Sequence, residues 1–435
     1  MSIPRFDAYL EHLRWLVSQP SPFTEPEKPA ALIAALHERF AALLPSHRFQ
    51  IDREGNLIGV PLELSSDLPV LYLSAHADTV PFDPALWTAP FTPHPAWEND
   101  QELVAQGVND CKAGVAFQLW LAQVASEHRC SLHQVVFTIT SKEEGAGRKS
   151  SVAIGEEMGK SLPAPVEGST LLVLENTVTS AAPYIPQVYA AESGSYAVQL
   201  LGTLPELRQA LTELPTWRPI AIEPETEVAA DYRLQSYVPA GHISTADPAA
   251  NPLRAAVLAA QDGQLLKAGD TRTTGTVPSS IGIAAGPLGT RHRLSVTERG
   301  QPPLAAVEAQ LRGREFRPIK PLHFSTGWDA TARVAESAVG RAFLAAADEG
   351  NARFARNPGA SDATMITASL PAAYRATLLP LVCGPGTRSQ REAVPPRLTH
   401  GPNETLIKVA AERSLQLLWR VLRSAGHLTE IGQSG

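Results

Sequence analysis

Hydrophobic residues at helical spacing open the chain. Apolar side chains recur every three or four residues between Pro4 and Val17, and the same pattern returns between Pro29 and Leu44. Strand-like runs of alternating or continuous apolar residues follow. The pattern predicts two amphipathic helices, then alternating strands and helices. The strand-like runs are 47–60, 70–74, 135–140 and 171–174, and helical stretches at 114–125 and about 149–158 separate the last three.

This alternation is typical of an α/β fold in which helices cover a mostly parallel central sheet. The short, continuous apolar runs suit strands that are buried on both faces. After Pro183 the pattern becomes less regular, and the segment 215–227 is rich in Pro and Glu. We therefore predict a discontinuous larger domain, 1–183 and 319–435, and a smaller α+β domain, 184–318. Its elements are expected at 196–200, 204–211, 251–260, 293–297 and 304–312, and those of the tail at 328–347, 379–383 and 403–423.

Charge and composition exclude some classes of function. The 435 residues contain 37 Lys and Arg against 44 Asp and Glu, a net charge of −7, so no overall basic field attracts nucleic acid. No apolar run approaches the roughly 18 residues that cross a membrane, and charged residues interrupt the N-terminal segment where a signal peptide would lie. Three cysteines are too few for a disulfide framework and indicate a reducing compartment, the cytoplasm.

Potential metal ligands follow three successive predicted strands. His76 and Asp78 follow the strand at 70–74, Glu143 and Glu144 follow the strand at 135–140, and Glu175 follows the strand at 171–174. Ligands of open α/β sheets bind beyond the carboxyl ends of the strands. Each motif taken alone also fits a plainer role, a hydrogen-bonded histidine before a turn or a solvated acidic loop.

Two neighbouring glutamates favour a cation between them. Adjacent carboxylates repel each other unless a cation lies between them or one is protonated. A catalytic zinc site uses His and carboxylate ligands, keeps a position open for water and needs a base to deprotonate that water. Glu143 and Glu144 could divide the roles of base and ligand. Asp110 lies between the first two motifs, in a glycine-bounded loop that opens a helix.

Several motifs occur in a fixed order along the chain. They are Ser74–Pro81, Trp87 with Pro90 and Phe91, Gly107–Gly114, Thr140–Gly145, Gly359–Ala363, Val382–Gly386 and Thr399–Glu404. Together they resemble one family of metallopeptidases and deacylases, which includes acetylornithine deacetylase, succinyl-diaminopimelate desuccinylase, carboxypeptidase G-type enzymes and aminoacylase. The resemblance extends from the first helices to the last and implies a metallopeptidase-type catalytic domain with an inserted ferredoxin-like lid or dimerisation domain.

The resemblance implies a pair of divalent metal ions, usually Zn²⁺, with Co²⁺ or Mn²⁺ as alternatives. His76 and Glu175 would hold one ion, with Asp78 orienting His76, and Glu144 and His400 would hold the other. Asp110 would bridge both ions. Glu143 would be the general base, taking a proton from the attacking water and returning it to the leaving amine.

Further residues would contact the substrate, if the resemblance holds. A histidine of the smaller domain, often from the partner subunit, would stabilise the oxyanion, and His242 is the candidate, with Asn251 downstream of it. Arg299, or its neighbour Arg293, would bind the substrate carboxylate through a bidentate fork. Gly384 and Gly386 would present backbone amides to the same carboxylate.

The leading hypothesis is a cytoplasmic two-metal amidohydrolase that removes the acyl group from an N-acylated amino acid. A metallo-dipeptidase or carboxypeptidase would share the metal centre and differ in the pocket. A non-catalytic binding protein with the same fold would not need Glu143. The expected partner is a small N-acyl amino acid or short peptide, without nucleic acid or membrane. Residues 203–231 resemble an insertion that would alter the pocket or the homodimer expected through the smaller domain.

Overall fold

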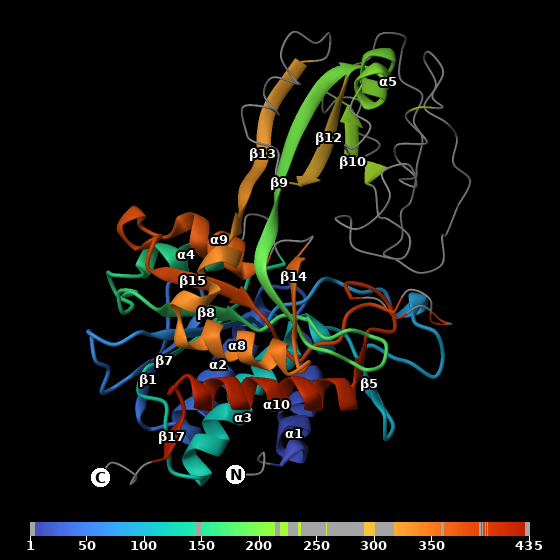
Figure 1. Ribbon diagram of the computed structural model, residues 1–435. Coiled ribbons are helices and arrows are strands. Elements are labelled where there is room, and N and C mark those ends of the chain that lie inside the picture. The colour runs from blue at the N-terminus through green and yellow to red at the C-terminus, as the bar shows by residue number, and fades with distance from the viewer. Residues whose placement is uncertain are drawn as a thin grey trace. The chain divides into compact units, whose positions relative to one another are not determined.

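A computed structural model describes most of the chain (Figure 1). The described residues are 5–144, 149–213, 218–224, 234–235, 258, 291–300, 317–357, 361–390, 393, 395, 397 and 399–430. They form two compact units. Unit 1 comprises Met1–Glu192, Asp329–Asn357 and Ser361–Gly435, and unit 2 comprises Ser193–Trp328 and Pro358–Ala360.

The unit boundaries differ from the predicted domain boundaries at residues 183 and 319. Strand β9 (Gln187–Thr203) begins in unit 1 and continues into unit 2, and β13 (Arg317–Asp329) runs from unit 2 to the first residue of the next unit 1 segment. Strand β9 crosses the boundary at Ser193, Gly194 and Ser195, which are residue types common in turns, so the sequence does not show that the strand continues into unit 2.

A parallel core of four strands lies at the centre of unit 1. The strand order is β7 (Val135–Thr140), β3 (Leu71–His76), β8 (Ser169–Val173) and β15 (Leu378–Val382), and all neighbouring pairs are parallel. All residues of these four strands are buried. This sheet, covered on both faces, confirms the predicted α/β class with a largely parallel centre.

Antiparallel strands extend this core at both edges. The hairpin β1 (His47–Ile51) and β2 (Leu57–Pro61) pairs with β7, whereas the sequence pattern suggested one continuous segment. At the other edge Tyr189 of β9 pairs with Val382, and β14 (Arg353–Asn357) runs parallel to β9. Short strands complete the unit: β4 (Trp97–Glu98), β5 (Glu102–Val104) and β16 (Thr405–Ile407) form one small sheet, and β6 (Cys130–Ser131) pairs with β17 (Thr429–Glu430).

Helices cover the two faces of the sheet (Figure 1). On one face α4 (Lys149–Glu157) packs on α9 (Asp362–Ser369), which contacts β3, β8 and β15. On the other face α3 (Ala113–Glu127) contacts β3 and packs against α1 (Phe6–Val17) and α2 (Glu27–Leu43). Helix α10 (Lys408–Ser424) packs against α8 (Ala338–Asp348). Both opening helices were predicted within two residues of their observed ends.

Two predicted helices of the tail differ from the structure. The helix expected over 328–347 is divided into the 3₁₀ helix η5 (Thr331–Glu336) and α8, because the side chain of Ser337 caps a new helix by accepting the N–H of Gly340 at 2.9 Å. The helix expected over 403–423 begins only at Lys408. The residues before it form β16, which pairs with β5.

In its described part, unit 2 is built on antiparallel strands. Strand β12 (Arg291–Gly300) lies between β9 and β10 (Arg218–Pro224), and β11 (Leu234–Gln235) pairs with β10. Helix α5 (Leu204–Glu213) follows β9, and β13 pairs with β9. Residues 215–227 were expected to form a linker, but the structure places strand β10 within this range. Part of segment 203–231 therefore belongs to the sheet. The helices expected at 251–260 and 304–312 lie outside the described residues.

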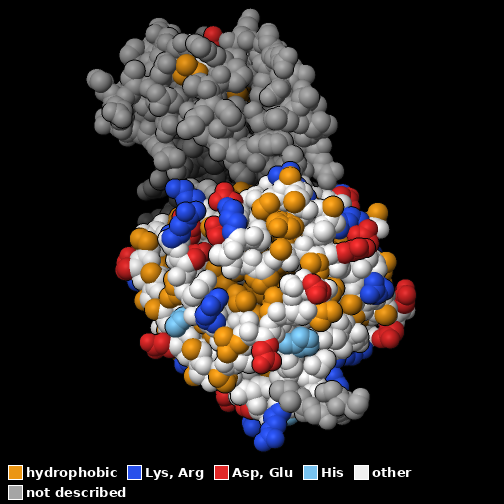
Figure 2. Space-filling view, turned by 90° about the vertical axis from the view of Figure 1, so that its left-hand side faces the viewer, with side chains coloured by type: hydrophobic (Ala, Val, Ile, Leu, Met, Phe, Trp, Pro, Cys, Tyr) orange, Lys and Arg blue, Asp and Glu red, His pale blue; other side chains and the backbone are white. Residues whose placement is uncertain are grey.

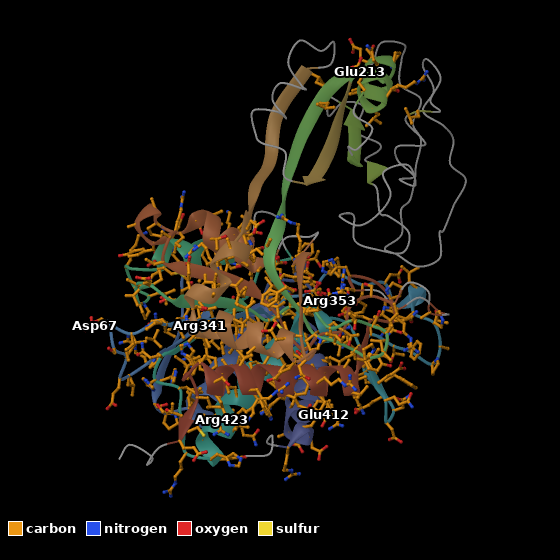
Figure 3. The ribbon with its side chains drawn as sticks, in the orientation of Figure 1. Asp67, Glu213, Arg341, Arg353, Glu412 and Arg423 are labelled. Carbon is orange, nitrogen blue, oxygen red and sulfur yellow. The ribbon has the colours of Figure 1, made fainter. Side chains whose placement is uncertain are left out.

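Hydrophobic, charged and other polar side chains are intermixed on the face of unit 1 that Figure 2 shows. The sticks of Figure 3 place Asp67, Arg341, Glu412 and Arg423 on the outside of the unit. No described helix combines the length and hydrophobicity needed to span a membrane.

Candidate metal centre

The carboxyl ends of neighbouring strands bring the predicted ligands together. Strand β3 ends at His76, β7 leads into Glu143 and Glu144, and β8 leads into Glu175. Because β7, β3 and β8 are adjacent and parallel, these segments leave the sheet at the same edge. The pattern found in the sequence therefore corresponds to one location in unit 1.

His76 is held between two acidic residues. Its Nδ1 atom lies 3.0 Å from the backbone carbonyl oxygen of Asp78 and 3.6 Å from the carboxylate Oδ1 of that residue. Its Nε2 atom lies 2.8 Å from Oδ1 of Asp110. A proton on Nδ1 would satisfy the Asp78 carbonyl and leave Nε2 as the ligand atom. This is the orientation expected of a metal-binding histidine whose second nitrogen has a carboxylate neighbour.

Asp78 also holds the glutamate pair. Its Oδ1 accepts a hydrogen bond from the backbone N–H of Glu143 at 3.0 Å, and its Oδ2 accepts one from the N–H of Glu144 at 2.9 Å. Asp78 is fully buried. One carboxylate thus positions the end of β3 and the end of β7 relative to each other.

Asp110 lies at the centre of the cluster. Its two carboxylate oxygens face different imidazoles: Oδ1 lies 2.8 Å from Nε2 of His76, and Oδ2 lies 2.8 Å from Nε2 of His400. His400 Nε2 is also 2.9 Å from Oε1 of Glu144. Single ligand atoms of His76, Asp110 and Glu144 lie within 4.8 Å of one another. The geometry suits a carboxylate shared by two ions.

Backbone conformation brings Asp110 and His400 into the cluster. Gly107, with φ of 70°, starts the turn η2 (Val108–Lys112), in which Asp110 has non-helical angles of −119° and 91°. His400 also has a positive φ of 60°. These residues come from loops in which neither helical nor strand periodicity holds. The backbone angles of these loops direct the two side chains into the site, and the hydrophobic pattern of the sequence does not predict those angles.

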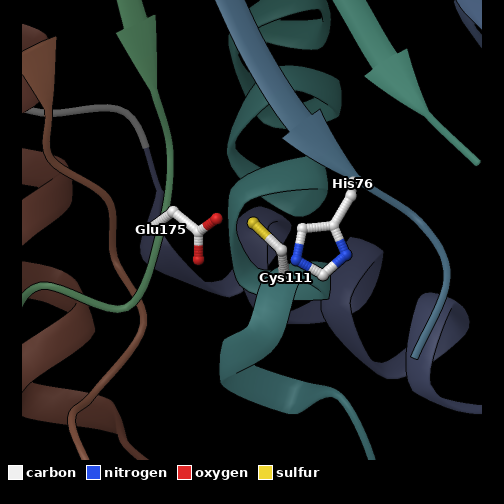
Figure 4. Close-up of side chains that lie close together, drawn as sticks. All are labelled: His76, Cys111 and Glu175. Atoms are coloured by element: carbon white, nitrogen blue, oxygen red, sulfur yellow. The ribbon is translucent and has the colours of Figure 1, made fainter. Parts of the chain in front are cut away.

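Glu175 and Cys111 also lie close to His76, and Figure 4 shows the Cys111 side chain between those of Glu175 and His76. One ligand atom from each of the three residues lies within 4.8 Å of the others. The thiol of Cys111 donates to the carbonyl oxygen of Leu174 at 3.0 Å. No hydrogen-bond donor among the described residues reaches the Glu175 carboxylate. Burial, together with the charge of Asp110, raises the pKa of Glu175 well above its ordinary value.

The charged groups of the cluster shift one another's pKa values. Burial lowers the pKa of His76 and of His400, but the surrounding acidic groups outweigh it, and both pKa values lie well above the ordinary histidine range. Burial raises the pKa of Asp110, but His400 and His76 outweigh it and hold that pKa well below the ordinary range. Positive charge among these residues therefore stabilises the acidic groups. A divalent ion bound by the same atoms would supply that charge.

The glycines of the closing loop allow close packing. A Cβ on Gly384 would lie 2.3 Å from the carbonyl oxygen of Glu175, and one on Gly386 would lie 2.7 Å from that of Asn109. The N–H of Gly384 already donates to Thr177 Oγ1 at 3.1 Å. The loop therefore lies against the metal centre, and its glycines are needed for that contact.

The predicted residues of the smaller domain are not in this cluster. His242 and Asn251 lie outside the described residues. Arg293 and Arg299 lie on β12, where they pair with Leu201 and Ser195 of β9. The structure describes only their backbone, so their proposed contacts with substrate stay predictions.

Several buried polar residues around the cluster had no role predicted from the sequence. Glu404 accepts backbone N–H groups of the Asp110 loop, including that of Asp110 at 3.1 Å. Asn109 bonds to the backbone of Thr405 and Thr387. Asp362 accepts hydrogen bonds from Thr140 and Ser151 beside the end of β7. Glu404 and Asp362 lie in motifs that carried the resemblance, which was the available signal.

A family model matches the segment that contains most of these residues. The model of peptidase family M28 matches residues 56–176, which include six of the predicted residues, His76, Asp78, Asp110, Glu143, Glu144 and Glu175. No curated protein sequence matches the chain.

Solved structures share the fold over almost the whole chain. An M20 family metallo-carboxypeptidase from Sulfolobus solfataricus has 15% identity and a TM-score of 0.61, covering 96% of this chain and 99% of its own. Human carnosine dipeptidase 1 has 12% identity and a TM-score of 0.60, covering 97% of both chains. A dinuclear metal binding peptidase of the M20 family from Bacillus subtilis has 13% identity and a TM-score of 0.53, covering 96% of both.

The fold and the matched segment define the class of protein. The chain has the metallopeptidase fold, and the match to a peptidase family covers several of the motifs that contain the predicted ligands. The resemblance to metallopeptidases and deacylases is thereby confirmed. The chain is a metal-dependent hydrolase of peptide or amide bonds.

Proposed function

We propose that the chain is a two-metal amidohydrolase that cleaves the amide bond of an N-acylated amino acid. The observation that carries the proposal is the double contact of Asp110, whose two oxygens each lie 2.8 Å from the Nε2 atom of a different histidine. A carboxylate with His76 on one side and His400 on the other has the arrangement of a bridging ligand between two sites. Glu143 beside this centre supplies the base that hydrolysis requires.

The residues present fit two divalent ions. His76 and Glu175 would hold one ion, Glu144 and His400 the other, and Asp110 both. Glu175 supports this arrangement, because the residue is buried, no described residue donates a hydrogen bond to its carboxylate, and a bound cation would supply compensating positive charge. Histidine nitrogens and carboxylate oxygens favour Zn²⁺, with Co²⁺ or Mn²⁺ as substitutes.

Glu143 would move the proton during the reaction. Bound divalent ions would lower the pKa of a bound water to near neutral and polarise the amide carbonyl. The Glu143 carboxylate would accept a proton from the attacking water and transfer it to the leaving nitrogen, so that an amine departs rather than an amide anion. Its buried position excludes bulk water, and the hydrogen bond from its backbone to Asp78 fixes its place beside the ligands.

Residues of unit 2 would complete substrate binding. We propose that His242, with Asn251, stabilises the oxyanion, that Arg299 or Arg293 binds the substrate carboxylate, and that a homodimer forms through this unit. The amide of Gly384 already has an acceptor in Thr177, so the Gly386 amide is the better candidate of the closing loop. Three buried, free cysteines support a reducing, cytoplasmic location.

Peptide hydrolysis is the second candidate function. Solved structures that share this fold carry the names tripeptidase, carnosine dipeptidase and metallo-carboxypeptidase. The same metal centre and the same base would serve a short peptide, since only the group on the acyl side of the bond differs. A substrate panel separates the two candidates.

The test combines that panel with matched glutamate variants. Full-length protein, loaded with Zn²⁺, Co²⁺ or Mn²⁺, is assayed on N-acetyl and N-succinyl amino acids, dipeptides and tripeptides. In Glu143→Gln, kcat should fall by about 10²- to 10⁴-fold while metal content stays near two per chain. In Glu144→Gln, metal content should fall as well.

The outcomes separate the hypotheses. Turnover of N-acyl amino acids supports the deacylase, and preference for dipeptides or tripeptides transfers the assignment to a peptidase. Wild-type protein that binds two metals but hydrolyses nothing in the panel would favour a binding protein with the same fold. Equal turnover by wild type and Glu143→Gln would contradict the role of that residue as base.

A further inference from the structure

A buried carboxylate outside the predicted ligand set holds the loop that carries Asp110. Glu404 is 1% exposed. Its Oε1 accepts the backbone N–H groups of Asn109 at 2.8 Å and of Asp110 at 3.1 Å, and its Oε2 accepts that of Gly107 at 3.0 Å. One side chain thus accepts hydrogen bonds from three of the four residues of the segment 107–110.

These N–H groups depend on Glu404 because of the shape of the loop. Asp110 and Cys111 have non-helical angles, so the start of η2 lacks the regular hydrogen bonds of a helix. A buried N–H without an acceptor is unfavourable by about 1–3 kcal/mol. The carboxylate of Glu404 supplies the acceptors that the loop itself does not.

A second connection fixes the same loop to the chain around Glu404. Asn109 donates through Nδ2 to the carbonyl oxygen of Thr405 at 2.8 Å, and its Oδ1 accepts the N–H of Thr387 at 2.7 Å. The loop is therefore attached to the start of β16 by both side chain and backbone. The position of Asp110 follows the position of residues 404 and 405.

The same short segment contacts Asp110 a second time. His400, four residues before Glu404, places Nε2 2.8 Å from Oδ2 of Asp110. Segment 400–404 therefore touches the backbone of Asp110 through Glu404 and its carboxylate through His400. Its length sets the distance between two of the proposed ligands.

We propose that Glu404 is a positioning residue of the metal centre, which fixes the Asp110 carboxylate relative to His400 and so controls the affinity of the ion held by His400 and Glu144. This inference rests on the proposed function. Loss of the clamp should affect that ion more than the one at His76 and Glu175, because His76 is fixed independently by Asp78. Partners in the second shell of a metal site typically change affinity or activity by about 10- to 100-fold.

Glutamine at position 404 tests this inference with minimal change of shape. The amide retains one acceptor oxygen and presents an NH₂ group in place of the other, so at least one of the three N–H groups loses its acceptor. Glu404→Asp keeps both oxygens but is shorter by one methylene. It is measured alongside as a milder change in case the first variant does not fold.

Glu192→Gln is the matched control. Glu192 is also a fully buried glutamate that accepts hydrogen bonds, from Thr364 Oγ1 at 2.6 Å and Asn357 Nδ2 at 2.7 Å. It contacts none of the proposed ligands through these bonds. Its substitution reproduces the general effect of removing a buried carboxylate from unit 1.

The experiment is a calorimetric titration of metal-free, full-length protein with Zn²⁺, combined with metal content, kcat, KM and denaturant unfolding. Wild type should show two binding steps. In Glu404→Gln one of the two steps should lose about 10- to 100-fold in affinity, more than the other step loses, and kcat should fall, with a smaller change in KM. Glu404→Asp should change the same step in the same direction, and Glu192→Gln should leave both steps unchanged.

Each result has a definite meaning. If both position-404 variants are less stable but bind two metals like wild type, Glu404 is structural only and the inference is overturned. The same holds if Glu192→Gln weakens zinc binding as much as Glu404→Gln. Wild-type protein that binds no divalent metal would overturn the proposed function and this inference with it, whereas loss of turnover alone would affect only the former.

Discussion

The Oδ1 atom of Asp78 accepts the backbone N–H of Glu143 at 3.0 Å, across two neighbouring parallel strands. Its other oxygen accepts the N–H of Glu144, and its own carbonyl oxygen lies 3.0 Å from Nδ1 of His76. A ligand of each proposed ion and the proposed base therefore share one positioning residue. The role of Asp78 is wider than the orientation of His76 that the resemblance implied.

Asp78→Asn should weaken zinc binding by about 10- to 100-fold and lower kcat to a similar extent. The amide places a donor group opposite one of the two backbone N–H groups, so either Glu143 or Glu144 must shift. Zinc titration of the metal-free protein measures the first effect. Hydrolysis of the substrate identified by the panel measures the second.

Asp52→Asn is the control for this substitution. Asp52 Oδ1 also accepts backbone N–H groups, from Glu54 at 2.9 Å and Asn56 at 2.8 Å, but it lies in the β1–β2 turn. The substitution Asp52→Asn should lower the stability of the protein without changing its affinity for zinc. Equal zinc affinities for Asp78→Asn and wild type would show that Asp78 does not position the ligands.

The sequence was sufficient for ligands that directly follow strands. The position of His76, Glu143, Glu144 and Glu175 at one edge follows from parallel pairing of three apolar runs. Glu404 could not be found in this way. Its partners are backbone N–H groups almost 300 residues away in the sequence, and backbone groups carry no residue-specific signal.

The fold was less predictable where tertiary contacts override local pattern. Strand β10 contains Pro219 and Pro224 and reads as a linker, yet pairing with β12 keeps it extended. Residues 405–407 read as the start of a helix, but they pair with β5. In both cases a partner strand distant in sequence supplies the hydrogen bonds.

Glu175→Gln should have opposite effects in the presence and absence of metal. In metal-free protein the Glu175 side chain is buried and receives no hydrogen bond from any residue that the structure describes, so glutamine should leave the free energy of unfolding unchanged or raise it. With zinc, a 10- to 100-fold loss of affinity should reduce the metal-induced stabilisation by about 1.4–2.7 kcal/mol. Denaturant unfolding with and without a chelator measures both.

The control for this reversal is Glu156→Gln, an exposed residue near the end of α4, which should leave the stabilisation by zinc unchanged. Wild-type protein itself should lose stability when the chelator removes metal. If Glu175→Gln is destabilised equally in both conditions, Glu175 acts through packing and is not a ligand.

Gly384→Ala should disturb the end of β8. The new Cβ would lie 2.3 Å from the carbonyl oxygen of Glu175 and 2.4 Å from the carbonyl carbon of Leu174, both backbone atoms that cannot rotate away. We expect a loss of about 1–3 kcal/mol in stability and weaker zinc binding, because Glu175 must move with its backbone. Gly350→Ala has open space around the Cβ and should reduce stability only through its positive φ of 75°, with zinc binding intact. Unchanged zinc affinity in Gly384→Ala would separate this loop from the metal centre.

Buried His47 should make unit 1 sensitive to acid. Burial lowers its pKa to about 4, and its Nε2 lies 3.0 Å from the carbonyl oxygen of Val135. A histidine in the unfolded chain has a pKa near 6.5, so below that pH the unfolded state binds a proton that the folded state does not. The stability contributed by the neutral imidazole is therefore complete above pH 6.5 and is lost as the pH falls towards 4.

The loss between pH 7 and pH 5 should be roughly 2 kcal/mol for this one residue. His47→Gln retains an N–H for the Val135 carbonyl but has no proton to gain, so its unfolding free energy should fall by that much less over the same interval. The exposed His128 provides the control, and His128→Gln should keep the wild-type dependence on pH. Denaturant unfolding at pH 7, 6 and 5 measures the slopes, with chelator present so that metal release does not contribute. Parallel slopes for His47→Gln and wild type would show that His47 is not the source of the acid sensitivity.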